Sequence, residues 1–492
     1  MPLGAALPIL KENKTSGCGP SGCGTESEES QRLQNLRSEL LDIVAKARQE
    51  GNIGNGVAPA PETYEVVLSL TRPLEFVVEL SHRKVDGVHV WVGVLQGALV
   101  VLDDQEHELF IRLQQGVTPG ELRDAITQEG LVEADAAWPV VSKLIGRLAT
   151  AGLIEGIRGH NERKVIDPAR FARFHLTQAC QLECVHCYAD SSPFVDRKGE
   201  LTTEQWAKAI TDFAENGGEQ ILFTGGEALM HKGCIELLRH SKDLGLEVTL
   251  FSNGILIPRY AERLQGIVDT VQISLDGPDA ESNDQIRGEG TYKRILKAIH
   301  ILLKQGTKTR IGMTVVPEKW ELWKSQFLSV AEEFAVYPNI EYKLSYGVMQ
   351  YGRGVEIESQ QAEDTFSIDQ YLDRINDREG PKITRTKTGC GYAEQLVVGP
   401  KGEIFPCHLL DAPMFHIEDY PMPDILDTLR ALIHQVDVDH VEGCKTCEIR
   451  YLCGGGCRVI ESRKTGSRLM NTCNAEKKHK KYKNLVKTFA AN

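Results

Sequence analysis

The sequence predicts an α/β protein built on a partial (β/α)6 TIM-like barrel, preceded by a winged-helix-like α+β domain and followed by a cysteine-rich domain. Three observations support this. Short apolar runs alternate with helical patterns over residues 168–360, which is typical of parallel βαβ units. Within residues 62–160, strand patterns precede three helical patterns. Seven of the 13 cysteines lie within residues 385–480.

The first 61 residues are expected to lie outside these domains. Residues 1–26 are rich in glycine, serine and charge, which indicates a disordered arm. Cys18 and Cys23 lie in this arm, either as part of an unstructured tail or as a mobile thiol pair. Over residues 27–61, leucines at helical spacing predict one amphipathic helix, and GNIGNGVAPAP then reads as a linker.

The small domain of residues 62–160 is predicted from the alternation of apolar and polar residues. Apolar and polar residues alternate in TYEVVLSL, LEFVVEL, VHVWVGV and GALVVLD, as in half-buried antiparallel strands. Helices are expected in DDQEHELFIRLQQG, TPGELRDAITQEG and ADAAWPVVSKLIGRLATAGLI, the second with Thr118 as N-cap and Pro119 in the first turn. Winged helices often bind DNA, but these helices carry few basic residues, so we expect no nucleic-acid partner.

The barrel is predicted from six buried, β-branched runs with helices between them. In such a barrel the reacting groups belong at the carboxyl ends of the strands. The segment CQLECVHCY directly follows the first run. The six runs are FARFHLT, QILFTGG, EVTLFSNG, TVQISLDG, RIGMTVV and IEYKLSY.

Composition narrows the setting of the protein. The net charge of −13 over 492 residues argues against nucleic acid as the main partner. No apolar run is long enough to span a membrane, and the first residues lack a basic n-region, so we expect a cytoplasmic protein without a membrane partner. The basic stretch EKKHKKYKNLVK is expected to be a solvated helix face, and residues 481–492 a tail.

Three cysteines at C-x3-C-x2-C spacing suggest a particular kind of metal site. Cys180, Cys184 and Cys187 supply three thiolates. A structural zinc site takes four ligands, whereas three thiolates on a [4Fe-4S] cluster leave one iron open to a small molecule. A chain without an export signal favours metal ligation over disulfides.

This motif and the strand ends that follow it resemble the radical SAM superfamily. TGGEA, SNG, SLDG and NDQIRGEGTY stand where that family binds S-adenosyl-L-methionine (SAM), with Ala228 for a usual Pro and Asn283 for a usual His. By resemblance, Glu227 takes the methionine ammonium and Arg287 its carboxylate, which fits the need for one charge partner each. The SAM contacts that the resemblance implies are Tyr188, Gly225, Gly226, Glu227, Asn253, Ser274 and Arg287.

Near the end of the chain, Cys390 and Cys407 precede a C-x2-C-x5-C-x3-C run from Cys444 to Cys457, and Cys473 follows. These cysteines resemble the seven-cysteine SPASM pattern of peptide-modifying members of that superfamily. The resemblance implies two auxiliary clusters, hence three [4Fe-4S] clusters in all. The first auxiliary cluster is expected to keep an open iron unless a remote residue such as Cys234 closes it; a buried hydrophobic role for Cys234 is the alternative. The implied ligands are Cys444, Cys447, Cys453 and Cys473 for one cluster, and Cys390, Cys407 and Cys457 for the other.

The small domain resembles the RiPP recognition element, a peptide chaperone related to that of pyrroloquinoline quinone biosynthesis, through FIRLQQGVTPGEL and LIGRLATAGLI. This implies a precursor peptide as partner, whose leader adds a strand to an exposed sheet edge. We therefore expect a maturase that uses a 5'-deoxyadenosyl radical to install a thioether or carbon–carbon crosslink in that peptide. An electron donor such as flavodoxin or ferredoxin is also expected.

Three alternatives stay open. One is maturation of haem or another cofactor. A second is sulfatase-type maturation, although those enzymes carry an Asp base where this chain has His408, which is expected to act as a base or as a hydrogen-bond donor beside a cluster. The third is a zinc-bound peptide-binding scaffold without catalysis.

Overall fold

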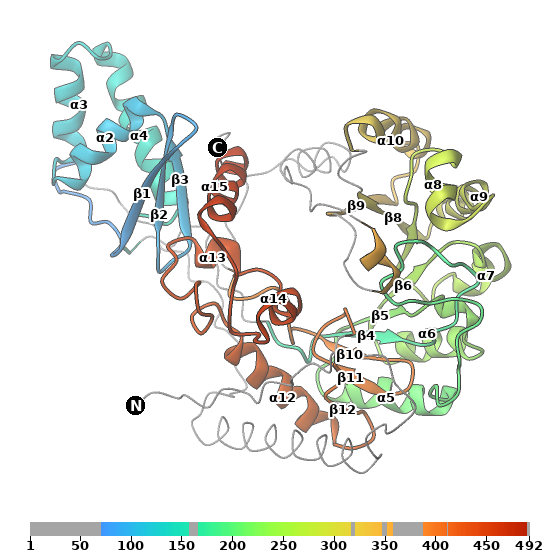
Figure 1. Ribbon diagram of the computed structural model, residues 1–492. Coiled ribbons are helices and arrows are strands. Elements are labelled where there is room, and N and C mark those ends of the chain that lie inside the picture. Colours follow the sequence, from blue (N-terminus) through green and yellow to red (C-terminus); the bar gives the residue numbers. More distant parts are fainter. Residues whose placement is uncertain are drawn as a thin grey trace.

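The computed structural model describes residues 70–156, 166–315, 320–346, 352–357, 387–410 and 412–489 (Figure 1). The predicted arm, helix and linker of residues 1–61, with Cys18 and Cys23, lie outside these ranges. So does nearly all of the predicted strand TYEVVLSL.

The first described unit is a three-stranded antiparallel sheet, in the order β1-β2-β3, followed by three helices. Two predicted strands and all three helices are confirmed, and Thr118 forms the expected cap through a reciprocal pair of hydrogen bonds with Glu121. Asp86 and Gly87, both at positive φ, turn the first hairpin. The elements are β1 (Leu80–Val85), β2 (Val88–Gly93), β3 (Ala98–Leu102), α2 (Asp104–Gln114), α3 (Pro119–Gln128) and α4 (Ala134–Thr150).

The strand predicted at LEFVVEL is wrong. Only Phe76 forms an isolated bridge there, to Ile154, and β1 begins at Leu80. The cause is local: Glu79 has a φ of 61°, which interrupts the extended chain between the two segments. A left-handed residue does not disturb the alternation of apolar side chains, so the pattern conceals it.

The second unit is the predicted barrel, and all six of its strands are confirmed. They run parallel in the order β4 to β9, each paired with the next. Helix α5 shows how the outer layer is fixed: Trp206, Ile210 and Phe213 share one face and are fully buried in the barrel core. The strands are β4 (Phe171–His175), β5 (Gln220–Thr224), β6 (Glu247–Ser252), β7 (Thr270–Ser274), β8 (Lys308–Val315) and β9 (Ile340–Tyr346).

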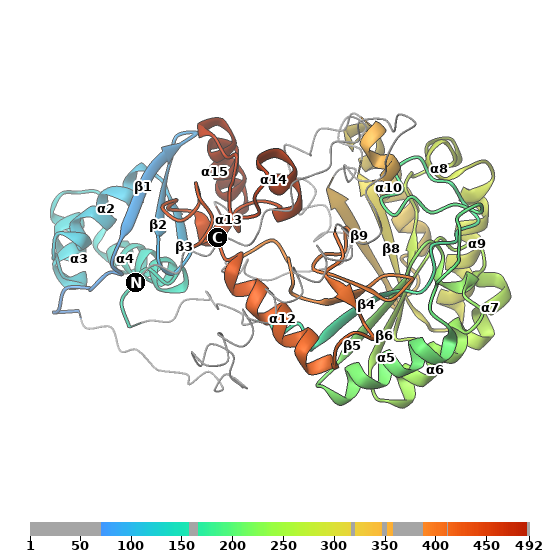
Figure 2. The ribbon, with the colours of Figure 1, turned by 60° about the horizontal axis from the view of Figure 1, so that its bottom comes forward.

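The helices α5 to α10 connect these strands and cover the outer face of the sheet (Figure 2). Two short 3-10 turns, η1 (Ala228–Met230) and η3 (Gly352–Glu356), lie beside the strand ends. The helices are α5 (Thr203–Glu215), α6 (Cys234–Asp243), α7 (Ile257–Leu264), α8 (Ala280–Arg287), α9 (Thr291–Lys304) and α10 (Trp320–Phe334).

The C-terminal segment extends the same sheet. β10 pairs in parallel with β4, and β11 and β12 follow as antiparallel neighbours, so nine strands form one sheet in the order β12-β11-β10-β4-β5-β6-β7-β8-β9. The elements are β10 (Leu396–Val398), β11 (Glu403–Phe405), β12 (Phe415–His416), α12 (Met422–Gln435), α13 (Arg450–Cys453), α14 (Arg458–Thr465) and α15 (Ala475–Phe489).

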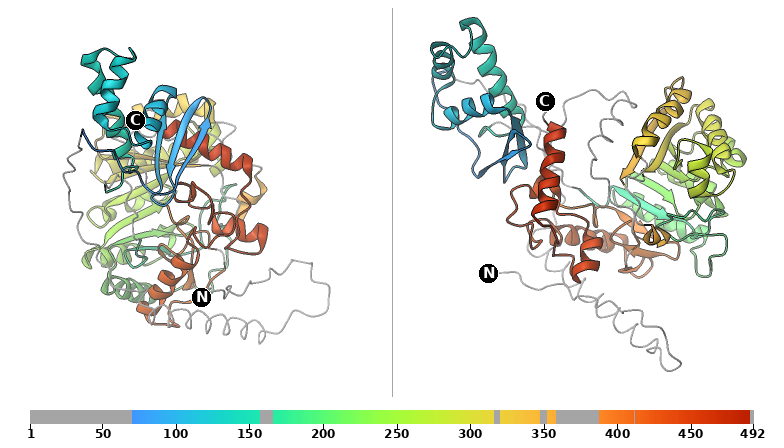
Figure 3. Two further views of the ribbon diagram at one scale, coloured as in Figure 1. Left: turned by 90° about the vertical axis from the view of Figure 1, so that its left-hand side faces the viewer. Right: turned by 45° about the horizontal axis from the view of Figure 1, so that its top comes forward.

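Helix α15 packs the C-terminal part of the chain against the small domain. It runs from Ala475 to Phe489, across the boundary expected at residue 480, and contains the basic stretch. Its apolar face packs on the outer face of the small sheet, and Tyr482 is 1% exposed in that contact. Figures 1 and 3 show α13 and α15 between the small domain and the barrel.

The described helices include none with both the length and the apolar character of a membrane span.

Candidate active site

The cysteine loop follows β4 and is tied to neighbouring loops by its backbone. Cys180 and Cys184 are buried and Cys187 is half-buried. The Cys180 N–H donates to the Ser192 carbonyl (3.2 Å), and the Val185 N–H donates to the Ile286 carbonyl (3.0 Å). Burial raises the pKa of Cys180 to about 11 and also raises the pKa of Cys184. A bound cation would therefore be needed to hold both thiols as thiolates.

The glycine pair after β5 lies directly against this loop. The Gly226 N–H donates to the Thr177 carbonyl and the Glu227 N–H to the Ala179 carbonyl, both at 2.8 Å. A Cβ atom on Gly226 would stand 2.3 Å from the Ala179 oxygen, and Gly225 has a φ of 141°. Two glycines are required here because one backbone packs on another without room for a side chain.

Glu227 connects the ends of β5 and β6. Its side chain is 1% exposed, and its carboxylate accepts hydrogen bonds from the Asn253 N–H (2.8 Å) and the Ser252 hydroxyl (3.1 Å). Burial raises the pKa of Glu227 to about 7, although these hydrogen bonds oppose the rise. The carboxylate thus positions the SNG turn, and its contact with the methionine ammonium stays a prediction.

Asn253 also faces the cysteine loop. Its Nδ2 donates to the Cys180 sulfur (3.4 Å), and its Oδ1 accepts from Gln181 Nε2 (3.0 Å). This side chain therefore supports the first cysteine, and its contact with the ribose of SAM stays a prediction. Ser274 ends β7 and is half-buried at the same edge of the sheet.

Arg287 lies beside the second cysteine and has a partner that the sequence did not reveal. Arg287 Nη2 pairs with Asp276 at 2.5 Å, and Nη1 lies 4.0 Å from the Cys184 sulfur. His186 also contacts Asp276, at 2.8 Å. Burial opposes ionisation of Asp276, but Arg287 and His186 outweigh it and hold its pKa well below the usual value.

Part of the Arg287 guanidinium is still open for a ligand. Its Nε is buried and has no hydrogen-bond partner in the described chain. A buried donor without a partner costs free energy unless a ligand satisfies it. Arg287 Nε is therefore the atom that could donate to the carboxylate of an amino acid. Asp276 balances the positive charge of the guanidinium. Asp276 lies in the SLDG turn and His186 lies between two cysteines of the motif. Both belong to segments that the sequence singled out, but the sequence does not indicate that they contact each other.

Arg353 is a third residue that the sequence did not indicate. It lies in the 3-10 turn η3, and its guanidinium makes three contacts to the cysteine loop. Nε donates to the Cys184 carbonyl (3.0 Å), Nη2 donates to the Ser191 carbonyl (2.8 Å), and Nη1 pairs with Asp190 (2.8 Å). Arg353 therefore clamps the loop that carries the three cysteines.

The C-terminal cysteines gather in two groups. The first consists of Cys444, Cys447, Cys453 and Cys473, whose thiols interact electrostatically with one another. In the second, Cys390 and Cys457 form a thiol hydrogen bond, and Cys407 lies near Cys457. These groups coincide with the two predicted ligand sets, and iron ligation by them stays a prediction. Cys234 is 1% exposed in the barrel core, in the electrostatic range of Glu227.

The spacing of these thiols bears on the zinc alternative. A tetrahedral zinc with Zn–S bonds of about 2.3 Å holds its sulfurs about 3.8 Å apart. Among the described residues, which include all cysteines from Cys180 onward, no three thiols lie within 4.8 Å of one another. Zinc ligation and iron–sulfur ligation by these thiols both stay predictions.

His408 faces the barrel from the C-terminal segment. Its Nδ1 lies 3.8 Å from the Cys407 sulfur. Burial, together with the nearby cations Arg173 and Lys343, lowers the pKa of His408 to about 4, so the imidazole is neutral at neutral pH. Cationic side chains from β4 and β9 therefore lie near His408.

Tyr188, directly after the third cysteine, stands edge-on to His175 at the end of β4, with ring centroids 6.5 Å apart. Its predicted contact with SAM stays a prediction.

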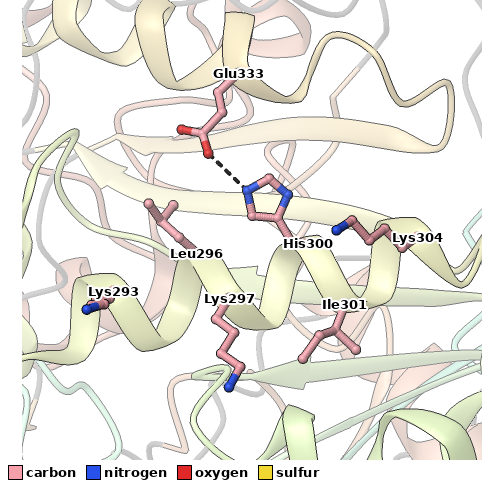
Figure 4. Close-up of a pocket in the computed structure, with 7 residues that line it drawn as sticks. All are labelled: Lys293, Leu296, Lys297, His300, Ile301, Lys304 and Glu333. Carbon is pink, nitrogen blue, oxygen red and sulfur yellow. Dashed lines mark hydrogen bonds and ion pairs between the residues drawn. The ribbon is translucent and has the colours of Figure 1, made fainter.

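A surface hollow on α9 is a different feature. Lys293, Lys297, His300 and Glu333 are among the residues that line it, and His300 pairs with Glu333 at 2.9 Å (Figure 4). No predicted site residue lines it, so it is not a candidate active site.

Comparison with known proteins gives the following. Residues 174–325 match the Radical SAM superfamily. The AdoMet-dependent heme synthase of Methanosarcina barkeri is 28% identical over 333 residues, which are 61% of this chain and 94% of that protein. The sporulation killing factor maturation protein SkfB of Bacillus subtilis is 31% identical over 269 residues, 52% of this chain and 64% of that protein.

A solved structure shares the fold. It is native anSMEcpe with bound AdoMet, with a TM-score of 0.50 and 18% identity, and the match covers 65% of this chain and 98% of that one.

Proposed function

Because this chain belongs to the radical SAM superfamily and is an enzyme, we propose that it modifies a ribosomally synthesised precursor peptide by removing a hydrogen atom from an unactivated carbon. The observation that carries the proposal is the convergence of the three-cysteine loop after β4, the glycine pair after β5 and Arg287, at the end of the helix α8 that follows β7, on the carboxyl-end side of the parallel sheet. Such ends are where barrel enzymes place their reacting groups.

The peptide enters the proposal through the relatives and the domain arrangement. SkfB is named a maturation protein, and other relatives are named a PqqA peptide cyclase and a subtilosin biosynthesis protein. This chain also carries a small sheet domain apart from the barrel. Leader binding there would supply binding energy away from the reacting residue, which separates recognition from chemistry. The bond formed, thioether or carbon–carbon, belongs to the proposal.

The residues have distinct parts in it. When bound, the reduced [4Fe-4S] cluster and SAM supply a 5'-deoxyadenosyl radical. Cys180, Cys184 and Cys187 would hold the cluster, and Asn253 and Arg287 stand beside two of these sulfurs. Glu227 and Arg287 would take the two charged ends of the methionine part of SAM. The two C-terminal cysteine groups would hold two further clusters, and the one at Cys390, Cys407 and Cys457 would keep an open iron unless a remote residue such as Cys234 closes it.

A second candidate function has its own support. Haem maturation is favoured by the likeness to heme synthases and by the cations Arg173 and Lys343 beside His408, because propionate carboxylates would pair with such cations. The same cations would suit a peptide with acidic residues, so the substrate has to be tested directly.

The first experiment measures iron, sulfide and 5'-deoxyadenosine under anaerobic conditions. We expect about twelve irons in the wild type and about eight in a Cys180→Ala/Cys184→Ala/Cys187→Ala variant, in line with three four-iron clusters. The variant should form no 5'-deoxyadenosine from SAM and dithionite. Cys234→Ala removes one buried thiol outside this loop and should keep the iron of the loop and the formation of 5'-deoxyadenosine. Equal iron in the wild type and the triple variant would contradict the cluster assignment.

The second experiment separates the substrates. Precursor peptides encoded near the gene, and iron coproporphyrin, are incubated with SAM and reductant and then examined by mass spectrometry. Loss of two hydrogens from a peptide supports the proposal. Loss of carboxyl groups from the porphyrin, with all peptides unchanged, would replace it by haem maturation.

A further inference from the structure

Three histidines gather on the small domain, far along the chain from the cysteine loop. His82 lies on β1, His89 on β2 and His107 on α2. His82 pairs with Trp91 in the strand register and Lys84 pairs with His89, so His82 and His89 are diagonal neighbours on the face that α2 covers. In the described part of the chain, this is the one group of three potential ligands whose atoms lie within 4.8 Å of one another.

The distances suit a small metal ion. His82 Nε2 lies 2.9 Å from His89 Nδ1. The ring centroids of His89 and His107 are 3.7 Å apart, and those of His82 and His107 are 4.8 Å apart. Tetrahedral zinc with Zn–N bonds of about 2.0–2.1 Å holds its nitrogens about 3.4 Å apart. The one hydrogen-bonded nitrogen pair is closer than that value, and all three ligand atoms lie within 4.8 Å of one another, so the stacked rings would have to turn about their side-chain torsions to direct three nitrogens at one ion.

Burial lowers the pKa of His82, and the neighbouring His107 and His89 lower it further. Burial and His89 likewise lower the pKa of His107. Neutral imidazole is the form of histidine that binds a metal.

Asp104 provides the outer partner that metal-binding histidines usually have. Its Oδ1 lies 2.8 Å from His89 Nε2, which leaves His89 Nδ1 directed at His82. A carboxylate on the distal nitrogen fixes the tautomer and the ring orientation of a ligand. Lys84 Nζ also contacts Asp104, at 2.6 Å, so the carboxylate separates that ammonium from the histidines. His107 Nδ1 accepts a hydrogen bond from Trp91 Nε1 (3.1 Å), so a metal bound at that nitrogen would replace this hydrogen bond.

We propose that His82, His89 and His107 form a binding site for a divalent transition-metal ion of the zinc type, with Asp104 orienting His89 and water as the fourth ligand. The ion would fasten the β1–β2 hairpin to α2 and leave the cysteine groups to iron. The site does not depend on SAM cleavage or on the identity of the substrate.

The test measures zinc in the full-length, iron-reconstituted protein under anaerobic conditions. Zinc is added, excess is removed, and zinc and iron are counted together. We expect about one tightly held zinc in the wild type, with nitrogen and oxygen neighbours at about 2.0–2.1 Å and no sulfur in the zinc X-ray absorption spectrum. A His82→Ala/His89→Ala/His107→Ala variant should lose this zinc and keep its iron. The matched control is His300→Ala/His434→Ala/His440→Ala, which removes three histidines outside the group.

Two milder variants keep the test decisive if the triple variant misfolds. Asp104→Asn should weaken zinc binding about 10-fold to 100-fold, the usual cost of losing an outer partner. His82→Ala removes a solvent-exposed ligand and should weaken it as well. Wild-type protein without bound zinc, zinc ligated by sulfur at about 2.3 Å, or affinity unchanged in both milder variants would each overturn the proposal.

Discussion

At the scale of single residues, the candidate site is held by side chains that act on the backbone of the cysteine loop. Arg353 contacts two carbonyls and one carboxylate of that loop, and Asp276 places Arg287 beside Cys184. Neither belongs to the ligand set. Both determine where the sulfurs stand, which is the part that outer partners have in metal sites.

Replacing Arg353 tests this role. Arg353→Ala should lower the affinity for iron at Cys180, Cys184 and Cys187 about tenfold, by analogy with other outer partners, and slow 5'-deoxyadenosine formation accordingly. The iron bound by the C-terminal cysteines should stay. Iron counts against chelator concentration measure the effect. Arg197→Ala, which removes a more exposed arginine paired with Glu200, is the control. Equal chelator resistance in both variants would argue against the clamp.

The residues found from the sequence and those missed differ in what fixes them. Short motifs in the sequence contain the cysteines, Gly226 and Glu227. Such motifs can be recognised in a single sequence because their residues stand at fixed spacings. Arg353 reaches Cys184 across 169 positions, and Asp276 reaches His186 across 90. Such pairings depend on the closure of the barrel and carry no local pattern. The three histidines of the small domain were missed for the same reason, since two strands and a helix must first pack.

At the scale of elements, helix ends show how local sequence sets local stability. Thr118 and Glu121 exchange hydrogen bonds at the start of α3, whereas Glu133 at the start of α4 makes no side-chain capping bond. The prediction from the sequence succeeded for α3 because the whole cap lies within four residues. It failed at LEFVVEL because one left-handed residue, Glu79, ended the extended run. The barrel strands were found because each is a short run that contains buried apolar residues and lies between helical patterns.

The caps allow a matched comparison. Thr118→Ala should lower the local opening free energy of α3 by about 1 kcal/mol. Glu133→Ala should leave α4 nearly unchanged because it removes no capping bond. Amide hydrogen exchange of the full-length protein reports each helix separately. A similar loss of protection in α3 and α4 would mean that the cap is not the source of the stability.

At the scale of the whole molecule, the small domain is fixed to the C-terminal segment through α15. Val90, Val92 and Val101 of the sheet contact Ile449, Leu452 and Tyr482, and the Tyr482 hydroxyl donates to Glu448 at 2.8 Å. This face of the sheet is thus already covered. A leader strand would have to pair with an edge strand of the sheet. The edge strands are β1 and β3.

Tyr482 gives the corresponding test. Tyr482→Ala should weaken the contact by about 3–5 kcal/mol, as aromatic truncation in a core does, and release the small domain, with a larger radius of gyration in X-ray scattering. Tyr482→Phe keeps the ring and loses one hydrogen bond, so its scattering should match the wild type. SAM cleavage without peptide should be equal in both variants. An unchanged radius in Tyr482→Ala would show that other contacts suffice to hold the domain.

The pairing of β10 with β4 has a consequence for how this protein is made. Ala172 meets its partner Leu396 only after 224 more residues have been synthesised. On the ribosome, the first barrel strand therefore emerges with one unpaired edge, and the small sheet with one uncovered face, until nearly the whole chain has appeared. Exposed strand edges invite association with other chains. The pairing of β10 with β4 therefore closes this edge only at the end of synthesis, and until then the growing chain is open to association through it.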